Sequence, residues 1–371
     1  MSLRVAIVGC GKIADAHAEH IQQIDGCHLV GVCDHEELMA SQLAERFAAE
    51  RYFDDVDDLL NEARPEVVHI TTPPQSHFEL ARYCLERGCH VYVEKPFTAD
   101  AGEAEELVRL AAKGNLRLTV GHDGQFSHAA RRLRELVREG YLGDAVVHME
   151  SYYGYDLGDA SYAAAFLRDP DHWVRRLPGG LAQNVISHGI ARIAEFLKGE
   201  HPRVIAQGFV SPRLRALGVD DVLDELRVLI VDDDGTTASF VFSSGMRPLP
   251  NQFRIFGATN GLLLDEGQQT VVKLRGRPFK SYLERFLPPV LLARQYLANA
   301  AHNVRLFLTN DFHMDGGKKA LIASFYRSIV EGTPAPIPSR EIVLTARVMD
   351  AIFEQLGAAS FGAGRREGMP C

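Results

Sequence analysis

Short hydrophobic runs alternate with stretches of helical periodicity over the first 120 residues of the chain. The first four runs lack regular polar alternation, as expected for strands buried on both faces of a sheet. The predicted strands are Leu3–Val8, His28–Cys33, Val67–Ile70, His90–Val93 and Arg117–Val120. The helices predicted between them are Ile13–Ile24, Glu36–Phe47, Gln75–Arg87 and Ala101–Ala112. This alternation predicts an α/β unit with a parallel sheet.

The pattern changes after Gly121. The next predicted elements are a helix at Ala129–Glu139, a long strand at Ala145–Tyr153 and a helix around Leu181–Leu197. Closely spaced strands follow at Val204–Phe209, Leu226–Val231, Thr237–Phe242, Gln252–Phe256, Leu262–Leu264 and Thr270–Leu274. Such a series predicts a largely antiparallel sheet. The last predicted helices are Val290–Phe307, Lys318–Val330 and Arg340–Leu356.

The length of 371 residues exceeds what one hydrophobic core usually supports, so we predict two domains. The change of pattern puts the boundary after residue 121. The first domain then covers residues 1–121 and the second covers residues 122–361. Residues 362–371 are predicted to form a flexible tail.

Composition narrows the class of protein. Hydrophobic residues make up 46% and charged residues 24%, which is typical of soluble globular proteins. We find no apolar run long enough to span a membrane and no signal-peptide cleavage site after the first strand. The net charge of −9 argues against nucleic acid as a partner. The six cysteines are scattered, without zinc-site spacing, so we expect reduced thiols, a cytoplasmic location and no metal.

A glycine-rich turn follows the first predicted strand and opens the first helix. Its residues, Gly9-Cys10-Gly11-Lys12-Ile13-Ala14, have the G-x-G-x-x-A spacing of a Rossmann dinucleotide-binding turn. In such a turn the first glycine permits the tight bend and the second lets the backbone approach a pyrophosphate. The free N–H groups of the following helix attract the phosphates. Gly9, Gly11, Lys12 and Ile13 are therefore candidate cofactor-binding residues.

An acidic residue ends the second predicted strand. Asp34 lies 20 residues after Ala14, the interval at which a carboxylate meets the adenosine ribose. Its charge repels a 2′-phosphate, and the following His35, Glu36 and Glu37 supply no arginine to neutralise one. We therefore expect NAD as the cofactor in preference to NADP. The alternative is an ordinary glycine turn with an N-capping aspartate.

Three further segments carry a resemblance to a known family. They are Thr71–His77 (TTPPQSH), Gly88–Pro96 (GCHVYVEKP) and Gly179–His188 (GGLAQNVISH). Shorter matches are Gly140–Gly143 and Phe256–Gly261. With the glycine turn, these segments make the whole chain resemble the glucose-fructose oxidoreductase / inositol dehydrogenase family, usually called Gfo/Idh/MocA.

The resemblance implies a Rossmann domain followed by a C-terminal α/β domain with a large open, largely antiparallel sheet. It implies an oxidoreductase that uses NAD(P) on a sugar, sugar acid, cyclitol or nucleotide-sugar alcohol, and that pairs through the open sheet into homodimers or homotetramers. It also adds cofactor-binding candidates, namely Thr71, Pro73, His77, Glu94 and Lys95.

Oxidation of an alcohol requires a group that takes up the hydroxyl proton. Lys95 follows the strand His90–Val93, at the sheet edge where α/β proteins bind ligands. By resemblance it binds the substrate hydroxyl and relays its proton, and His188 is the acid/base. His188 lies four residues after Asn184, so a helix puts both on one face. The alternatives are a surface lysine and a buried or capping histidine.

Asn184 departs from the family pattern, in which most members carry aspartate at this position. A neutral amide does not stabilise an imidazolium by charge, so we expect His188 to be a weaker base here. This puts simple inositol-type oxidation in doubt. We predict that Asn184, as a third catalytic candidate, tunes catalysis without abolishing it.

Several residues near these motifs are candidates for substrate contact. Arg175 and Arg176, beside Trp173, could clamp a carboxylate or phosphate, although a solvated loop is an alternative. Tyr153 offers a face for sugar stacking or for packing. His122 and Asp123 border the domain junction. A second hypothesis for the whole chain is a non-catalytic, dinucleotide-bound sensor, because fold alone does not fix function.

Overall fold

The structure is a computed structural model that describes residues 2–157, 167, 169, 171–177, 179–312 and 315–363, with side chains described up to residue 357. Contacts divide the chain into two compact units. Unit 1 comprises Met1–Asp123 and Gly317–Ala346, and unit 2 comprises Gly124–Gly316 and Arg347–Cys371. The sequence analysis assigned residues 317–346 to the second domain. The structure assigns them to unit 1, because their hydrophobic side chains pack on its sheet.

Unit 1 contains a six-stranded parallel sheet with the strand order β3-β2-β1-β4-β5-β6. Its strands are β1 (Leu3–Val8), β2 (Cys27–Cys33), β3 (Tyr52–Phe53), β4 (Val67–Ile70), β5 (His90–Val93) and β6 (Leu118–Val120). This is the order of a Rossmann fold, and it confirms the predicted parallel sheet. The sequence analysis missed β3, because two residues are too few to carry a hydrophobic period.

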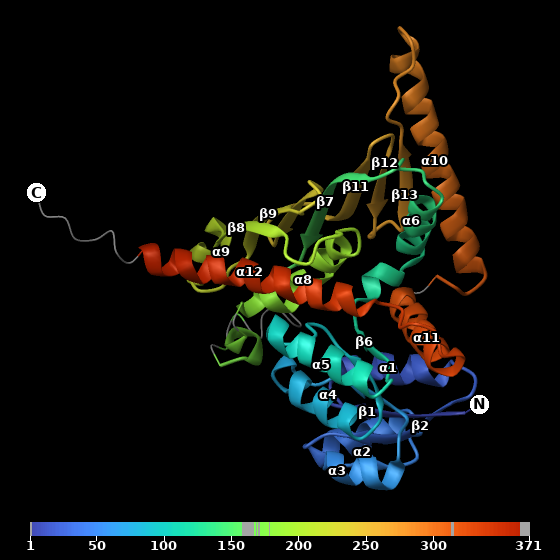
Figure 1. Ribbon diagram of the computed structural model, residues 1–371, viewed down its shortest axis with the longest axis vertical. Coiled ribbons are helices and arrows are strands. Elements are labelled where there is room, and N and C mark those ends of the chain that lie inside the picture. Colours follow the sequence, from blue (N-terminus) through green and yellow to red (C-terminus); the bar gives the residue numbers. More distant parts are fainter. Residues whose placement is uncertain are drawn as a thin grey trace, which may run out of the picture. The chain divides into compact units, whose positions relative to one another are not determined.

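The helices of unit 1 lie between these strands, except for α11. They are α1 (Lys12–Gln22), α2 (Glu37–Arg46), α3 (Val56–Asp58), η1 (Leu59–Ala63), η2 (Pro74–Ser76), α4 (His77–Glu86), α5 (Ala101–Lys113) and α11 (Gly316–Glu331). Phe325 of α11 packs against Tyr92 of β5, with ring centroids 6.1 Å apart. Helix α11, orange-red in Figure 1, comes from near the end of the sequence and packs on β5 of this sheet.

Unit 2 contains a seven-stranded sheet with the order β13-β12-β11-β7-β10-β9-β8. Its strands are β7 (Val146–Gly154), β8 (Arg203–Phe209), β9 (Glu225–Val231), β10 (Thr237–Ser243), β11 (Asn251–Gly257), β12 (Gly261–Asp265) and β13 (Thr270–Leu274). Only β7 and β10 pair in parallel, so the predicted largely antiparallel sheet is confirmed.

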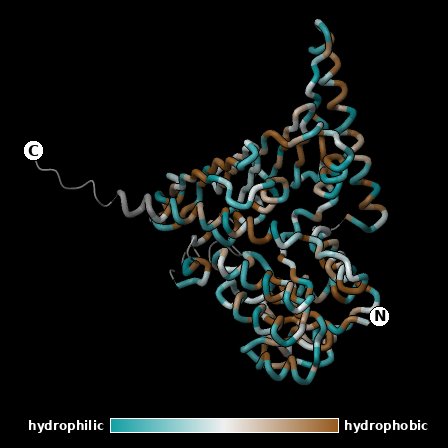
Figure 2. Tube along the Cα trace, viewed as in Figure 1, coloured by the Kyte–Doolittle hydropathy of each residue, from teal (hydrophilic) through white to brown (hydrophobic). Residues whose placement is uncertain are grey.

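The remaining helices are η3 (Asp123–Phe126), α6 (His128–Arg138), η4 (Trp173–Arg176), α8 (Gly180–Ala194), α9 (Pro212–Ala216), α10 (Leu283–Leu308) and α12 (Ser339–Ala363). Helix α10 runs alongside β13 and carries large apolar side chains that are well exposed, including Phe286 (66%), Leu297 (72%) and Phe307 (70%). Figure 2 shows hydrophobic positions along its length. None of the helices in the described residues is long and apolar enough to cross a membrane.

Helix α8 packs closely on the sheet of unit 2. A Cβ atom at Gly189 would lie 2.3 Å from Phe240 Cε2 of β10. The Ser151 hydroxyl of β7 donates a hydrogen bond of 3.0 Å to the Gly189 carbonyl, in the interior. Gly189 therefore determines how closely α8 approaches the sheet. It thereby also determines the distance of the neighbouring His188 from the sheet.

We expect Gly189→Ala to lower the stability of the protein. The added methyl group collides with the fully buried Phe240 ring, and such overpacking costs about 1–3 kcal/mol. Urea unfolding measures the loss. Gly357→Ala, in α12, is the matched control, because nothing lies within 4 Å of its Cβ position. Equal stability of the two variants would contradict this account of the packing.

Candidate functional site

The glycine turn of unit 1 is closed on one side and open on the other. Gly9 has a φ of +95°, and a Cβ there would lie 2.6 Å from the Thr72 backbone nitrogen, so other side chains do not fit. A Cβ at Gly11 would meet nothing within 4 Å. Lys12 is exposed, and Ile13 is 39% exposed although it is apolar. The turn thus presents free backbone, a cation and an apolar surface, which fits a dinucleotide pyrophosphate.

Asp34, at the end of β2, is held next to this turn. Its Oδ2 accepts a 2.7 Å hydrogen bond from the Cys10 N–H, and its Oδ1 accepts one of 3.0 Å from the Glu36 N–H. The exposed His35 ring lies 3.0 Å from Oδ1. The carboxylate is therefore fixed beside the turn, and its oxygens retain lone pairs for ribose hydroxyls. This geometry fits the ribose role predicted for Asp34.

The Thr71–His77 segment follows β4 at the same edge of the sheet. The Thr71 hydroxyl donates a hydrogen bond of 2.6 Å to the Gly9 carbonyl and thereby stabilises the turn. Pro73 is exposed. His77 is fully buried, with ring nitrogens 2.8 Å from the Pro96 carbonyl and 2.9 Å from the Thr72 carbonyl. The His77 ring thus links the loops that carry Thr72 and Pro96, and its predicted role in cofactor binding stays a prediction.

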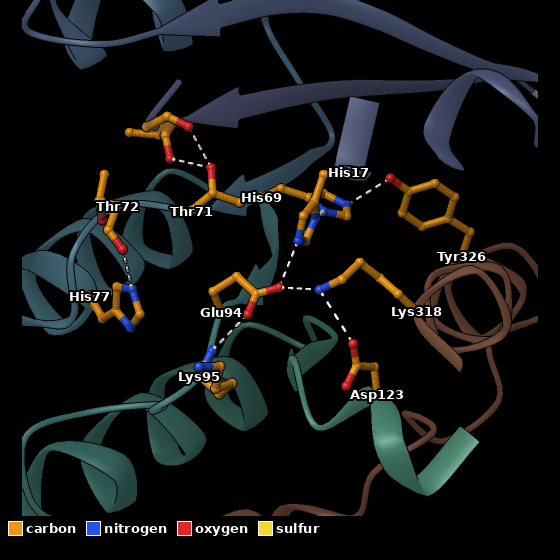
Figure 3. Close-up of polar contacts among 12 residues, drawn as sticks. His17, His69, Thr71, Thr72, His77, Glu94, Lys95, Asp123, Lys318 and Tyr326 are labelled. Carbon is orange, nitrogen blue, oxygen red and sulfur yellow. Dashed lines mark hydrogen bonds and ion pairs between the residues drawn. The ribbon is translucent and has the colours of Figure 1, made fainter. Parts of the chain in front are cut away.

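Glu94 follows β5, and its carboxylate lies in the interior of unit 1 (Figure 3). Lys318 Nζ donates to Oε1 at 2.6 Å, and His17 Nε2 donates to the same oxygen at 2.7 Å. Oε2 accepts the Lys95 backbone N–H at 3.1 Å. Lys318 also lies 3.6 Å from Asp123 Oδ2. Glu94 thus connects Lys95 to buried groups on α1 and α11, and its predicted contact with the cofactor stays a prediction.

A line of hydrogen bonds continues from Glu94 through two histidines to a tyrosine. His17 Nδ1 lies 2.7 Å from His69 Nδ1, and His69 Nε2 lies 2.7 Å from the Tyr326 hydroxyl. Because a carboxylate only accepts, His17 donates from Nε2, and its neutral ring accepts at Nδ1. His69 then donates from Nδ1 and accepts at Nε2 from the Tyr326 hydroxyl. Every proton in the line points toward Glu94.

Burial and the buried charges move the pKa values of these groups. Burial lowers the pKa of both His17 and His69, and Lys318 acts in the same direction, so both rings are neutral. Burial works to raise the pKa of Glu94, but Lys318 and His17 overcome it and hold that pKa well below its usual range. Burial also lowers the pKa of Lys95, which brings this lysine nearer to the range useful for proton transfer.

In unit 2, His188 and Tyr153 lie together. Their rings stack with centroids 5.9 Å apart and planes at 21°. Asn184 is buried one turn before His188 on α8. The three predicted residues thus occupy one region where α8 crosses β7.

Of the predicted arginine pair, Arg175 is hydrogen-bonded within unit 2. The Arg175 Nη1 donates to Asp221 Oδ2 at 2.7 Å, and Nη2 donates to the Leu167 carbonyl at 3.2 Å. Arg176 is exposed, and Trp173 lies beside His172, with ring centroids 5.6 Å apart. Arg175 is thus paired within unit 2, whereas the Arg176 side chain is exposed.

The sequence analysis missed His17, His69, Lys318 and Tyr326. Two signals pointed to them. His17 stands at a position of the α1 pattern otherwise filled by Ala14, Ala18 and Ile21, and His69 interrupts an apolar strand. Polar side chains at core positions need partners inside the protein. Nothing in the sequence identifies Lys318 as that partner, because it comes from the far end of the chain.

Comparisons with known proteins agree with this geometry. Residues 3–122 match the GFO_IDH_MocA family, described as an oxidoreductase family with an NAD-binding Rossmann fold. The segment that matches this family model contains the six strands of the parallel sheet of unit 1. The resemblance seen in the sequence is thereby confirmed, as is the NAD-binding class of the fold.

Two curated relatives match part of the chain. The chain is 36% identical over 146 residues to the D-glucoside 3-dehydrogenase of Escherichia coli, covering 39% of this chain and 42% of that protein. It is 34% identical over 133 residues to the UDP-N-acetylglucosamine 3-dehydrogenase of Acidithiobacillus ferrooxidans, covering 36% and 41%. The chain thus spans less than half the length of these curated relatives.

A solved structure extends the likeness in fold to nearly the whole chain. The WlbA dehydrogenase from Bordetella pertussis, solved with NADH and UDP-GlcNAcA, has a TM-score of 0.75 at 16% identity and covers 96% of both chains. At this identity the likeness shows the fold alone.

We expect the protein to lose stability on acidification below pH 6.5, the ordinary pKa of histidine. Below this pH, His69 binds a proton in the unfolded chain but stays neutral in the folded protein. Protonation therefore favours the unfolded state, and stability is lost as the pH falls. Each such histidine contributes about 1.4 kcal/mol per pH unit. His69→Gln should flatten the dependence of unfolding free energy on pH. The exposed His28→Gln should keep the wild-type slope, and parallel curves for all three proteins would contradict the prediction.

Proposed function

We propose that the chain is an NAD-dependent dehydrogenase that acts on a CH–OH group of a carbohydrate-like substrate. One observation carries the proposal: Lys95, whose pKa burial lowers, follows β5 at the same edge of the sheet as the glycine turn that follows β1. Both strands are parallel, and ligands of open α/β sheets bind at their carboxyl ends. A proton-transferring group is thus held in the same unit as the turn that fits the dinucleotide.

Cofactor binding in this proposal rests on Gly9, Gly11, Lys12, Ile13 and Asp34. Thr71 and Pro73 complete the edge, with Thr71 bracing the turn through the Gly9 carbonyl. Bound NAD would supply the redox chemistry. Glu94 and His77 act through their neighbours, since their side chains are turned into the interior.

Lys95 has the role of binding the substrate hydroxyl and taking up its proton. Its backbone N–H is fixed by Glu94, so the stem of the side chain starts from a defined point. We assign His188 as the acid/base partner, with Tyr153 stacked on its ring. Asn184 supplies an amide that holds a hydroxyl or orients His188 without adding charge.

The substrate class follows from the relatives' names and from the charges of the site. The named relatives act on a glucoside and a UDP-amino sugar, and another is a myo-inositol 2-dehydrogenase from Thermotoga maritima. We therefore propose a sugar, sugar acid, cyclitol or nucleotide sugar. The internal pairing of Arg175 argues against an arginine pair as the anion clamp, which leaves Arg176 and Trp173 as candidates for contact.

The non-catalytic sensor is the less favoured function. A sensor needs the dinucleotide turn but has no use for a lysine with a lowered pKa beside it. We also propose a homo-oligomer, because exposed apolar side chains along α10, together with Ile205 and Leu229 on the sheet, exceed what a lone surface usually carries.

We expect a higher kcat/KM with NAD than with NADP. Asp34 accepts hydrogen bonds from ribose hydroxyls and repels a 2′-phosphate. Asp34→Ala should therefore lower the ratio of the affinity for NAD to the affinity for NADP about tenfold or more. Fluorescence titration with both cofactors gives the ratio without a substrate. Asp25→Ala, exposed in the turn before β2, is the control and should leave the ratio unchanged. A preference for NADP in the wild-type protein would overturn the assignment of Asp34.

We expect Lys95→Ala to lose most of its turnover, about 100-fold or more, because general acid–base groups contribute factors of that size. NAD affinity should persist, since the glycine turn and Asp34 are unchanged. The measurement is NAD reduction with substrates drawn from sugars, uronates, cyclitols and nucleotide sugars. Lys113→Ala, exposed at the end of α5, is the matched control. Full activity of Lys95→Ala would remove Lys95 from the mechanism.

A further inference from the structure

Two cations and two carboxylates gather at the end of β5. Lys95 and Glu94 follow β5, Asp123 follows β6, and Lys318 comes from the first turn of α11. Lys318 is 4% exposed, and its Nζ lies 2.6 Å from Glu94 Oε1 and 3.6 Å from Asp123 Oδ2 (Figure 3). The group is formally neutral only while Lys318 is present.

The position of Lys318 is unfavourable by itself. Removing an ammonium group from water is costly, and the first turn of a helix carries a partial positive charge. The ion pair with Glu94 offsets both penalties, and it holds the pKa of Lys318 above its ordinary value despite burial. A cation is therefore permanently fixed at this point.

The Glu94 carboxylate connects Lys318 to the backbone of Lys95. Its Oε1 faces Lys318 and His17, while Oε2 accepts the Lys95 backbone N–H. On its other side the carboxylate packs on Gly121, where a Cβ would lie 2.9 Å from Oε2. Its position thus leaves little freedom for the backbone of Lys95.

We propose that Lys318 is a positioning residue for Lys95, which fixes Glu94 against the Lys95 backbone and supplies the second positive charge that makes Lys95 release its proton more readily. This inference rests on the proposed function only in giving Lys95 a proton to transfer. The contacts of Lys318 stand independently of any substrate.

The direction of the electrostatic effect follows from the groups around Lys95. Among the described residues, Glu94 and Asp123 favour the charged form of Lys95, and Lys318 disfavours it. His17 of α1 and His77 of α4 also face this region, and burial lowers the pKa of both, so they are neutral. Without Lys318, the two carboxylates of Glu94 and Asp123 lie near Lys95. The pKa of Lys95 should then rise, because a nearby positive charge that disfavours its charged form is gone.

Competitive labelling of lysines with a trace of acetic anhydride, read by peptide mass spectrometry at a series of pH values, tests this without substrate or cofactor. In Lys318→Met the pH midpoint for Lys95 labelling should move upward by about one unit or more, a usual size for a charge a few ångströms away. Lys318→Arg retains the charge and should restore a midpoint near that of the wild type. An unchanged or lower midpoint in folded Lys318→Met would overturn the inference.

Lys319→Met is the matched control, since Lys319 is the next residue on α11 and is partly exposed. Its Lys95 midpoint should equal that of the wild type, and a shift as large as that of Lys318→Met would also overturn the inference. Circular dichroism and NAD titration establish that each variant is folded.

If Lys318→Met does not fold, Glu94→Gln and the double variant Glu94→Gln with Lys318→Met replace it. In both variants residue 94 is a neutral glutamine, so no buried carboxylate loses its positive partner when Lys318 is removed. The double variant should then have the higher Lys95 midpoint, and equal midpoints would overturn the inference. Failure of the proposed function has a different signature. Wild-type protein would then bind no NAD or oxidise no alcohol, whatever the labelling shows.

Discussion

The ion pair between Glu94 and Lys318 is the interaction on which this part of the molecule depends. A buried carboxylate persists only if donors surround it, and Glu94 has Lys318, His17 and the Lys95 N–H. Each donor comes from a different place, namely α11, α1 and the chain just after β5. The requirement to satisfy one carboxylate thus fixes where two helices meet the central strand.

The same carboxylate sets the protonation of its neighbours. Because Glu94 only accepts hydrogen bonds, His17 and His69 adopt single neutral tautomers, and the Tyr326 hydroxyl points its proton toward His69. The line gives the interior of unit 1 a polar network in which these groups are hydrogen-bonded. Such a network favours one arrangement of the helices over others.

At this edge of the sheet, some residues hold the loops in place and others are available to contact ligands. The side chains of Glu94 and His77 are buried and hold the loops that carry Lys95 and Thr72. Gly11, Ile13 and Lys95 remain as the groups that face outward at this edge or retain partial exposure. The family motif therefore contains residues that position others as well as residues suited to contact ligands.

The sequence by itself determined the parallel and antiparallel sheets, the glycine turn and the place of Asp34, because hydrophobic period, turn chemistry and short spacing are local properties. It also carried the family resemblance, whose motifs are short and continuous. Only the tertiary structure decided that Lys318 belongs to unit 1 and joins Glu94, since these residues are 224 positions apart. No local pattern specifies which distant cation reaches a buried carboxylate. That choice is made when packing of Phe325 and Tyr326 against β4 and β5 brings α11 to the sheet.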